Sequence, residues 1–343
     1  MSHTIFSQII SIENLFFAWH EFKRGKRKKP DVQKFEFNLE DNLFKLNWIL
    51  KTGRYKHGHY QQFSINDPKP RIIHKACVQD RVVHHAVFRV LYPIFDKSFI
   101  YDSYSCRINK GTHRAVKKLE LFTKNTSRNY QFTCFILKCD IAKFFNTIDH
   151  QILIALIEKR IRDNPAMDLI REIIYSYRTI QDKGVPLGNL TSQLFANIYM
   201  NEFDQFVKHE LKMKRYIRYT DDFVFIHYDE QYLKEIISRS KDFLWNKLKL
   251  KFHPEKISIC KLNQGIDFLG YVVFPYHTIL RTRSKQRMLA KTHKRLMEYN
   301  GGRISRVSFN QTIQSYYGML QHCHGYSNKE FIKNIVKNGC DFS

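Results

Sequence analysis

The sequence predicts an α+β protein built from two or three subdomains. Its 343 residues, of which 43% are hydrophobic and 15% aromatic, suffice for a sizeable core and exceed one small module. Two stretches, 218–226 and 265–271, combine strand-forming residues with a short turn and are interpreted as hairpins. Elsewhere apolar residues recur at helical spacing, which indicates that helices accompany the strands.

The charge of the chain indicates a polyanionic partner. Lysine and arginine number 57 against 32 acidic residues, a net charge of +25, so nucleic acid is the first candidate and an anionic membrane surface the alternative. No apolar run approaches the roughly 20 residues that span a bilayer, and residues 1–17 do not have the pattern of a secretion signal. None of the seven cysteines forms a C-x-x-C pair, which argues against zinc and against a disulfide framework.

The first 60 residues are expected to be helical. Apolar residues at helical spacing predict helices over 12–22 and 39–51. The basic run 23–29 between them is interpreted either as a solvated loop or as a contact with RNA or an acidic partner.

Two groups of cations follow in 61–130. Residues 69–73 resemble a strand that carries cations, ahead of a helix expected over 78–91. Residues 103–114 place three cations beside a glycine, which suits phosphate because arginine forks onto two oxygens and glycine permits a close approach. The alternative is a polar connector into a helix near 113–124.

An apolar run over 131–138 predicts a buried strand, with Asp140 at its C-terminal end. Asp140 is interpreted either as a functional carboxylate or as a strand-end cap. A helix is expected over 150–161, and a loop with two glycines then leads into a long helix opened by Thr191 or Ser192.

Asp221 and Asp222 lie at the turn of the hairpin 218–226. Adjacent carboxylates repel each other, so a bound cation is one reason to keep them at an apolar hairpin, and a solvated turn is the alternative. If the strand before Asp140 is a neighbour of this hairpin, three carboxylates meet. Two Mg²⁺ ions held by such a group can activate a 3′-hydroxyl and neutralise a leaving pyrophosphate.

The C-terminal part is predicted to be a small helical domain that lies on a polyanion. A helix expected over 230–248 leads to a further strand and to the hairpin 265–271, and beyond it acidic residues are rare while basic ones are frequent. The triplet His322-Cys323-His324 looks like part of a metal site, but no second half accompanies it, so it is interpreted as structural.

At these residues the chain resembles the reverse transcriptase family. Six motifs occur in the family's order over most of residues 60–275. They are Lys69-Pro70-Arg71 with the segment Arg107 to Arg114, then Asp140-Ile141-Ala142-Lys143-Phe144-Phe145, the pattern of Gly184, Pro186, Gly188, Ser192, Gln193 and Asn197, then Tyr219-Thr220-Asp221-Asp222, Pro254-Glu255-Lys256 and Phe268-Leu269-Gly270. The resemblance implies a nucleotidyltransferase, an RNA-directed DNA polymerase that binds template RNA, primer or cDNA, and deoxynucleoside triphosphates.

The fold of that family is a right hand, which implies boundaries for this chain. Residues 1–60 would be an N-terminal helical extension and 61–130 the fingers. Residues 131–275 would be the palm, an antiparallel sheet flanked by helices with a finger-side insertion around 155–185, and 276–343 a small helical thumb.

The resemblance also implies roles for single residues. Asp140, Asp221 and Asp222 are the expected catalytic residues, and together with Ile141 they would bind two Mg²⁺ ions, for which Mn²⁺ can substitute. The expected nucleotide-binding residues are Lys69, Arg71 and Arg107 at the triphosphate, Phe145 beneath the sugar, Gln193, and Lys256 near the pyrophosphate. Template support and fidelity would involve Leu187, Gly188, Ser192 and Asn197, while Tyr219 and Gly270 belong to the motifs as structural residues.

A narrower resemblance lies at 187–193. Its Leu-Gly start and Ser-Gln end look like the reverse transcriptases of diversity-generating retroelements, whereas group II intron and retron enzymes carry Gln-Gly and Ser-Pro. The resemblance implies errors at template adenines, mutagenic retrohoming into a target gene, and a small basic accessory protein. The alternatives are a phage-defence enzyme, a group II intron or retron type, and a maturase-like RNA-binding scaffold. We expect a cytoplasmic protein, encoded by a bacterium or phage, without a membrane partner.

Overall fold

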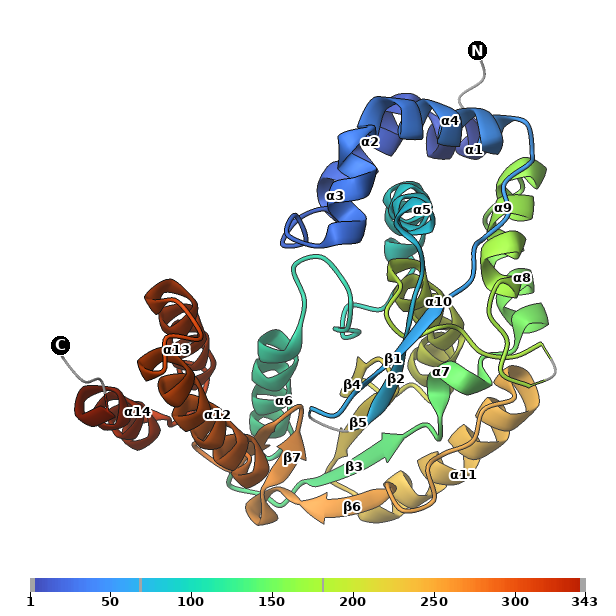
Figure 1. Cartoon of the computed structure of the whole chain (residues 1–343). Helices are drawn as coiled ribbons and strands as arrows, with labels where there is room; N and C mark the ends of the chain where they lie inside the picture. Colours follow the sequence, from blue (N-terminus) through green and yellow to red (C-terminus); the bar gives the residue numbers. More distant parts are fainter. Residues whose placement is uncertain (1–3, 68–69, 181, 340–343) are drawn as a thin grey trace.

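A computed structural model describes residues 4–67, 70–180 and 182–339. Its centre is a four-stranded antiparallel sheet with the strand order β4-β5-β3-β6 (Figure 1). The strands are β3 (Phe135–Asp140), β4 (Tyr216–Tyr219), β5 (Asp222–His227) and β6 (Ser258–Lys261). β4 and β5 form the predicted hairpin, and β3 pairs with β5, so two segments about 80 residues apart in sequence meet in the sheet.

Both faces of this sheet are buried, because successive side chains of each strand enter two different cores. One core combines Leu137, Tyr216, Phe223 and Phe225 with the helices α10 (Leu190–Gln205) and α11 (Glu230–Leu248). The other combines Ile136, Ile217, Val224 and Ile226 with α6 (Thr112–Thr126). Double burial explains why these strands read as apolar runs with few polar residues.

Further helices pack around the first core. α5 (Val78–Asp96) lies against α10, which also contacts α8 (His150–Glu158). The short α7 (Phe144–Thr147) links β3 to α8, and α9 (Asn164–Tyr175) packs on α8. Beyond Gln205, α10 continues as a π-helix over Phe206–Glu210.

The first three N-terminal helices contact α5, and the fourth packs on those three (Figure 1). They are α1 (Ile5–Ile10), α2 (Ile12–Phe22), α3 (Pro30–Phe37) and α4 (Leu39–Lys51). β1 (Gln61–Ile65) and β2 (Arg71–Lys75) then form a separate antiparallel hairpin.

The C-terminal part stands beside α6 (Figure 1). It begins with a three-stranded antiparallel sheet of β7 (Ile266–Phe268), β8 (Tyr271–Val273) and β9 (Thr278–Leu280). The helices α12 (Thr282–Asn300), α13 (Arg306–Leu320) and α14 (Tyr326–Gly339) follow and pack on one another. In the described ranges, no helix is both long and apolar enough to cross a membrane.

The predicted α+β class is confirmed, and α2, α4 and α11 have the predicted bounds. The helix expected to open at Thr191 or Ser192 begins instead at Leu190, because Asn189 has the extended backbone of an N-cap residue. β3 begins at Phe135, later than expected. Sequence periodicity missed α1 and α3, which at six and eight residues are too short for a helical stripe to stand out.

Candidate active site

The turn between β4 and β5 carries Asp221 and Asp222. Only Thr220 and Asp221 lie between the paired ends of the two strands. Thr220 has a φ of +58°, which a β-branched residue rarely adopts. Its Oγ1 donates to Ser105 Oγ at 2.6 Å, and its carbonyl oxygen accepts from Arg218 Nη1 at 3.0 Å. The acidic turn is therefore held in place by residues behind it.

Arg218 is the centre of that support. Its side chain and that of Asp204 are fully buried, with Nη2 at 2.7 Å from Oδ2 and Nε at 2.8 Å from Oδ1. The Tyr216 hydroxyl donates to the same carboxylate at 2.8 Å. Sequence analysis did not identify this pair. An arginine inside an apolar strand was the available signal, because a buried guanidinium needs a buried acidic partner.

β3 brings Asp140 next to the turn. Asp140 lies directly opposite Asp222 in the β3–β5 register, and alternation along both strands directs the two side chains toward the face that α6 covers. The largely buried Asp140 carboxylate accepts from Lys256 Nζ at 2.7 Å. The structure therefore brings together the three predicted aspartates and one predicted cation.

Negative charge accumulates at this end of the sheet. Burial and the charge of Asp140 raise the pKa of Asp221 to about 6. Burial, a hydrogen bond with Asp140 and the charge of Asp221 raise the pKa of Asp222. The positive charges of Lys256 and Arg71 lower the pKa of Asp221 without offsetting these effects.

This donor set fits a divalent cation. Among the described residues, no three carboxylate, histidine or cysteine side chains form a complete ligand set. The three aspartates nevertheless supply the hard oxygen ligands that Mg²⁺ takes, and a cation between them would relieve their repulsion. Asp140, Asp221 and Asp222 are the residues that would hold it. Ile141 has a hydrocarbon side chain, so the oxygen that it would offer to the cation is its backbone carbonyl.

The start of the segment 187–193 lies against β2. The Leu187 carbonyl oxygen accepts from the His74 backbone N–H at 3.1 Å. Gly188 has a φ of +113°, and a Cβ added there would lie 3.0 Å from Ile73 Cγ2. Position 188 therefore combines a left-handed backbone with a close contact to β2, and glycine suits both because it has no Cβ.

The rest of this segment opens α10. Ser192 is buried and Gln193 half-buried in its first turn, behind the N-cap residue Asn189. One turn further, the amide of the buried Asn197 donates to the Ser105 carbonyl at 2.9 Å and accepts from Arg218 Nη1 at 3.2 Å. The segment between 187 and 197 thus connects β2 to the support of the acidic turn.

A buried chain of hydrogen bonds, which we call the Thr191 relay, lies beneath this segment. Thr191 Oγ1 is 2.5 Å from His84 Nδ1, and His84 Nε2 is 3.0 Å from His57 Nε2. His57 Nδ1 donates to the Gly58 carbonyl at 2.7 Å, and burial with the neighbouring histidines lowers the pKa of His84. When both imidazole rings are neutral, one placement of the protons makes each of these contacts a hydrogen bond. In it the Thr191 hydroxyl donates to His84 Nδ1, and His84 Nε2–H donates to His57 Nε2. Sequence analysis did not identify the relay.

One predicted cation is engaged elsewhere in the protein. Arg107 Nε donates to Asp96 at 2.7 Å and its Nη1 to the Ile100 carbonyl at 2.7 Å. Because the guanidinium is hydrogen-bonded to other groups of the protein, we do not place Arg107 in the nucleotide site. Lys69 lies outside the described residues. Arg71 is exposed at the start of β2.

The remaining predicted residues are Phe145, Tyr219 and Gly270. Phe145 is half-buried, whereas Phe144 is fully packed in the core. The Tyr219 hydroxyl accepts from Thr112 Oγ1 at 3.3 Å. Gly270 has a φ of +91°, and its carbonyl accepts from the backbone of Arg281 at 3.0 Å.

Comparison with protein families gives one match that covers well over half of the chain. A family model described as reverse transcriptase (RNA-dependent DNA polymerase) matches residues 56–273. The match includes Asp140, Asp221 and Asp222, which we call the acidic cluster, and the segment 187–197.

Individual relatives share about a quarter of their aligned residues with this chain. The chain is 27% identical over 277 residues to protein YkfC of Escherichia coli K12, a match covering 66% of this chain and 70% of that protein. It is 25% identical over 308 residues to the group II intron-encoded protein LtrA of Lactococcus lactis, which covers 68% of this chain and 49% of LtrA, so it spans about half of that relative's length. A solved structure of apo telomerase from Candida tropicalis, truncated from the C-terminal domain, aligns with a TM-score of 0.48 and 15% identity over 70% of this chain and 60% of that chain.

Proposed function

Because the chain belongs to the reverse transcriptase (RNA-dependent DNA polymerase) family, we propose that it adds deoxynucleotides to a primer 3′-hydroxyl along an RNA template. The observation that carries this proposal is the pairing of Asp140 with Asp222 across adjacent strands, with Asp221 in the turn beside them. The enzyme class predicted from the sequence, RNA-directed DNA polymerase, is that of the family.

In this proposal each residue of the acidic cluster has a task. Asp140, Asp221 and Asp222 hold Mg²⁺, which when bound supplies positive charge to the attacking hydroxyl and the leaving pyrophosphate. Lys256 holds the Asp140 carboxylate in place through their ion pair. Its side chain is 43% exposed and is therefore accessible to a pyrophosphate.

Two further residues are proposed to hold the incoming nucleotide. Arg71 is exposed and close enough to Asp221 to influence its pKa, which suits contact with the triphosphate. Phe145 follows the catalytic strand with its ring half-buried, and we propose that it packs beneath the sugar and excludes a 2′-hydroxyl.

The test is primer extension by the purified chain with Mg²⁺, template RNA, primer and deoxynucleotides, with and without a candidate accessory protein. We expect cDNA from the wild type and none from Asp222→Ala, whose fold is checked by circular dichroism. A folded Asp222→Ala protein with full activity would rule out the metal assignment.

We further propose that the enzyme serves a diversity-generating retroelement, errs at template adenines, and works with a small basic accessory protein. The support is the Leu187-Gly188 start and Ser192-Gln193 end of the segment that connects β2 to the acidic turn. Sequencing of wild-type cDNA provides the test, and we expect substitutions concentrated at template adenines. Errors spread evenly over the four template bases would contradict this assignment.

A second candidate is a reverse transcriptase of the group II intron type, which the similarity to LtrA favours. That assignment predicts accurate copying of adenines and a requirement for intron RNA. The error spectrum therefore distinguishes the two.

We retain the predicted subdomain boundaries as part of the proposal. The break near 60 falls at the start of β1, and the break near 275 falls in the turn between β8 and β9. The insertion around 155–185 contains α9. Limited proteolysis is expected to cleave near these breaks before it cleaves within β3.

A further inference from the structure

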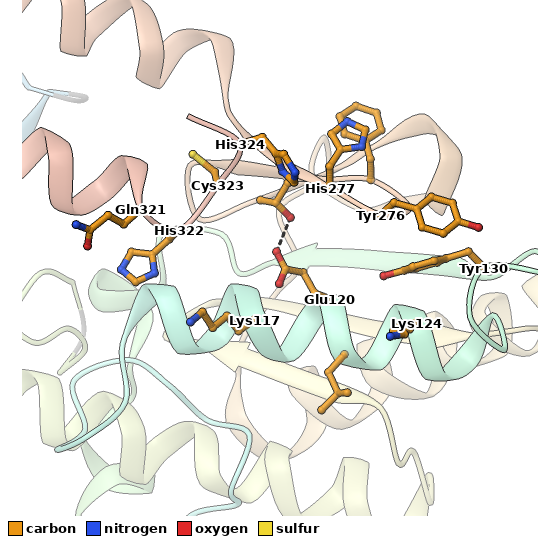
Figure 2. A pocket seen from close by; sticks show the side chains of 13 residues that line it. Lys117, Glu120, Lys124, Tyr130, Tyr276, His277, Gln321, His322, Cys323 and His324 are labelled. Atoms are coloured by element: carbon orange, nitrogen blue, oxygen red, sulfur yellow. Dashed lines mark hydrogen bonds between the residues drawn. The ribbon is translucent and has the colours of Figure 1, made fainter. Parts of the chain in front are cut away.

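A cavity of about 600 Å³ lies between α6, the turn that joins β8 to β9, and the loop between α13 and α14 (Figure 2). Its lining includes Lys117, Lys124, Tyr130, Tyr276, His277 and His322. Tyr130 precedes β3, whose opposite end carries Asp140, and a six-residue strand is about 20 Å long. The cavity is therefore a different site from the acidic cluster.

Contacts within the protein hold this cavity open without a ligand. The Thr278 hydroxyl donates to the Glu120 carboxylate, and the Thr278 carbonyl accepts from the His324 backbone at 2.7 Å (Figure 2). The rings of His113 and His322 stack with centroids 3.7 Å apart. Three segments that are far apart in sequence are thus fixed to one another. A preformed cavity reduces the ordering that binding requires.

Two tyrosines with left-handed backbones lie at one end of the cavity, and Tyr130 is half-buried against the core that α6 covers. Tyr276 is 77% exposed, and its backbone is left-handed with a φ of +70°. Tyr130, whose ring centroid lies 4.7 Å from that of Tyr276, is also left-handed with a φ of +67°. Glycine or asparagine would fit such a backbone better. The exposed ring of Tyr276 is available to a planar ligand, beside the half-buried ring of Tyr130 (Figure 2).

Positive charge flanks these rings. Lys117 and Lys124 lie two turns apart along α6, and within the part of the chain that the structure describes neither makes an ion pair. Glu120 between them is engaged by the Thr278 hydroxyl. Aromatic faces for a base together with ammonium groups for a phosphate are the combination that binds unpaired nucleotides.

We propose that this cavity binds an unpaired nucleotide of single-stranded RNA, in a part of the template that is not being copied. The proposal rests on the proposed function in that the chain handles RNA. Histidines and a cysteine also line the cavity, but the described residues include no group of three side chains placed to hold a metal ion there. Holding the template at this distance from the acidic cluster would keep RNA bound while the copied strand moves.

Photocrosslinking tests where RNA lies. The probe is a 12-nucleotide RNA containing 5-iodouridine, irradiated with the full-length chain and mapped by mass spectrometry. We expect attachment at Tyr276 or Tyr130, and its loss when unlabelled RNA of the same sequence competes. Attachment confined to other segments would overturn the proposal.

Binding of the same RNA, labelled with fluorescein, tests the residues. Because stacking on one aromatic ring contributes about fivefold or more to affinity, Tyr276→Ala should weaken binding by at least that factor. Lys124→Gln should lower the slope of log K against log salt by about 0.7. The matched controls are Tyr228→Ala, an exposed tyrosine elsewhere, and Lys247→Gln, an exposed helical lysine. Equal losses in test and control variants would overturn the proposal.

Two further arms separate this inference from other outcomes. A DNA 12-mer of the same sequence should bind more weakly, and equal or tighter DNA binding through the same residues would overturn RNA as the occupant. Extension of a short primer–template should be unchanged in Tyr276→Ala. If wild type extends no primer while RNA still crosslinks to Tyr276, the proposed function fails and the RNA site stands. If Tyr276→Ala instead loses only affinity for an accessory protein, the cavity is a protein-docking site and the proposal fails.

Discussion

Two carboxylate sites border the β4–β5 hairpin, one at Asp204 of α10 and the other at the turn, and they differ in how their charge is balanced. The buried Asp204 carboxylate accepts from the Arg218 guanidinium and from the Tyr216 hydroxyl, so its charge is fully compensated. Among the residues that the structure describes, one ammonium, that of Lys256, contacts the acidic cluster of Asp140, Asp221 and Asp222, and two of the cluster's pKa values are raised. The compensated site stabilises the fold, and the fold in turn holds together carboxylates that repel each other. Buried carboxylates whose negative charge is not neutralised within the protein indicate a site where a bound cation neutralises it.

The largest expected effect comes from removing one charge of the acidic cluster. Asp222→Asn should lower primer extension roughly a thousandfold or more, because a metal ligand is lost. The same change removes like-charge repulsion, so without divalent metal the variant should be more stable than the wild type. Primer extension and thermal unfolding in EDTA measure the two effects.

The control for this variant is Asp242→Asn, which changes an exposed aspartate of α11. It should leave both activity and the unfolding temperature unchanged. If Asp222→Asn destabilises the metal-free protein, the cluster is compensated after all and the comparison with Asp204 breaks down.

The next largest effect comes from breaking the compensated site. Arg218→Met leaves the buried Asp204 carboxylate without its cation, which should lower the free energy of unfolding by about 3–5 kcal/mol. The double variant Arg218→Met with Asp204→Leu should recover much of this loss, because no buried charge remains. Urea unfolding measures all three proteins, and Lys214→Met, an exposed position, should stay within about 0.5 kcal/mol of the wild type. Equal stability of Arg218→Met and the wild type would refute the scaffold role.

The acidic cluster was predictable from sequence and its supports were not. Asp221 and Asp222 are adjacent, and Asp140 ends an apolar strand, so local pattern and motif order sufficed to group them. Arg107 shows the limit of such reasoning. Its basic surroundings predict a phosphate contact, but Asp96, 11 residues upstream, takes the guanidinium once α5 and the following loop pack together.

The Thr191 relay depends still more on tertiary structure. Its members lie 27 and 107 residues apart in sequence, so no local pattern connects them. Histidine and threonine are common in loops and helices, and only the packing of α5 against α10 shows that their polar atoms are buried and paired.

The Thr191 relay is buried and hydrogen-bonded but carries no charge, so disrupting it should lower the free energy of unfolding by less than disrupting the Arg218–Asp204 pair. Thr191→Val keeps the shape of the side chain and leaves His84 Nδ1 without its donor, which should lower the free energy of unfolding by about 1–3 kcal/mol. Because Thr191 lies in the segment proposed to support template and nucleotide, the KM for deoxynucleotides should rise more than kcat falls. Thr191→Ser retains the hydroxyl and should restore both quantities. A Thr191→Ser protein as impaired as Thr191→Val would show that the methyl group, and not the relay, matters.

The smallest effect on stability, and the narrowest effect on function, is expected at Gln193. Its side chain is half-buried in the first turn of α10 and belongs to neither carboxylate site, so Gln193→Ala should change the free energy of unfolding by less than about 0.5 kcal/mol. If a flexible amide here loosens the support of the base pair, removing it should lower misincorporation at template adenines up to about fivefold, which corresponds to 1 kcal/mol, and leave errors at the other bases unchanged. Leu187→Gln should act in the same direction without disturbing the hydrogen bond from the His74 backbone N–H to the Leu187 carbonyl, because that bond does not involve the side chain. Deep sequencing of cDNA from both variants, with Gln231→Ala on the exposed surface of α11 as control, measures the spectrum. Adenine errors that persist in both variants would locate their origin outside this segment, and Arg71, on the strand that the segment touches, would then be the next residue to change.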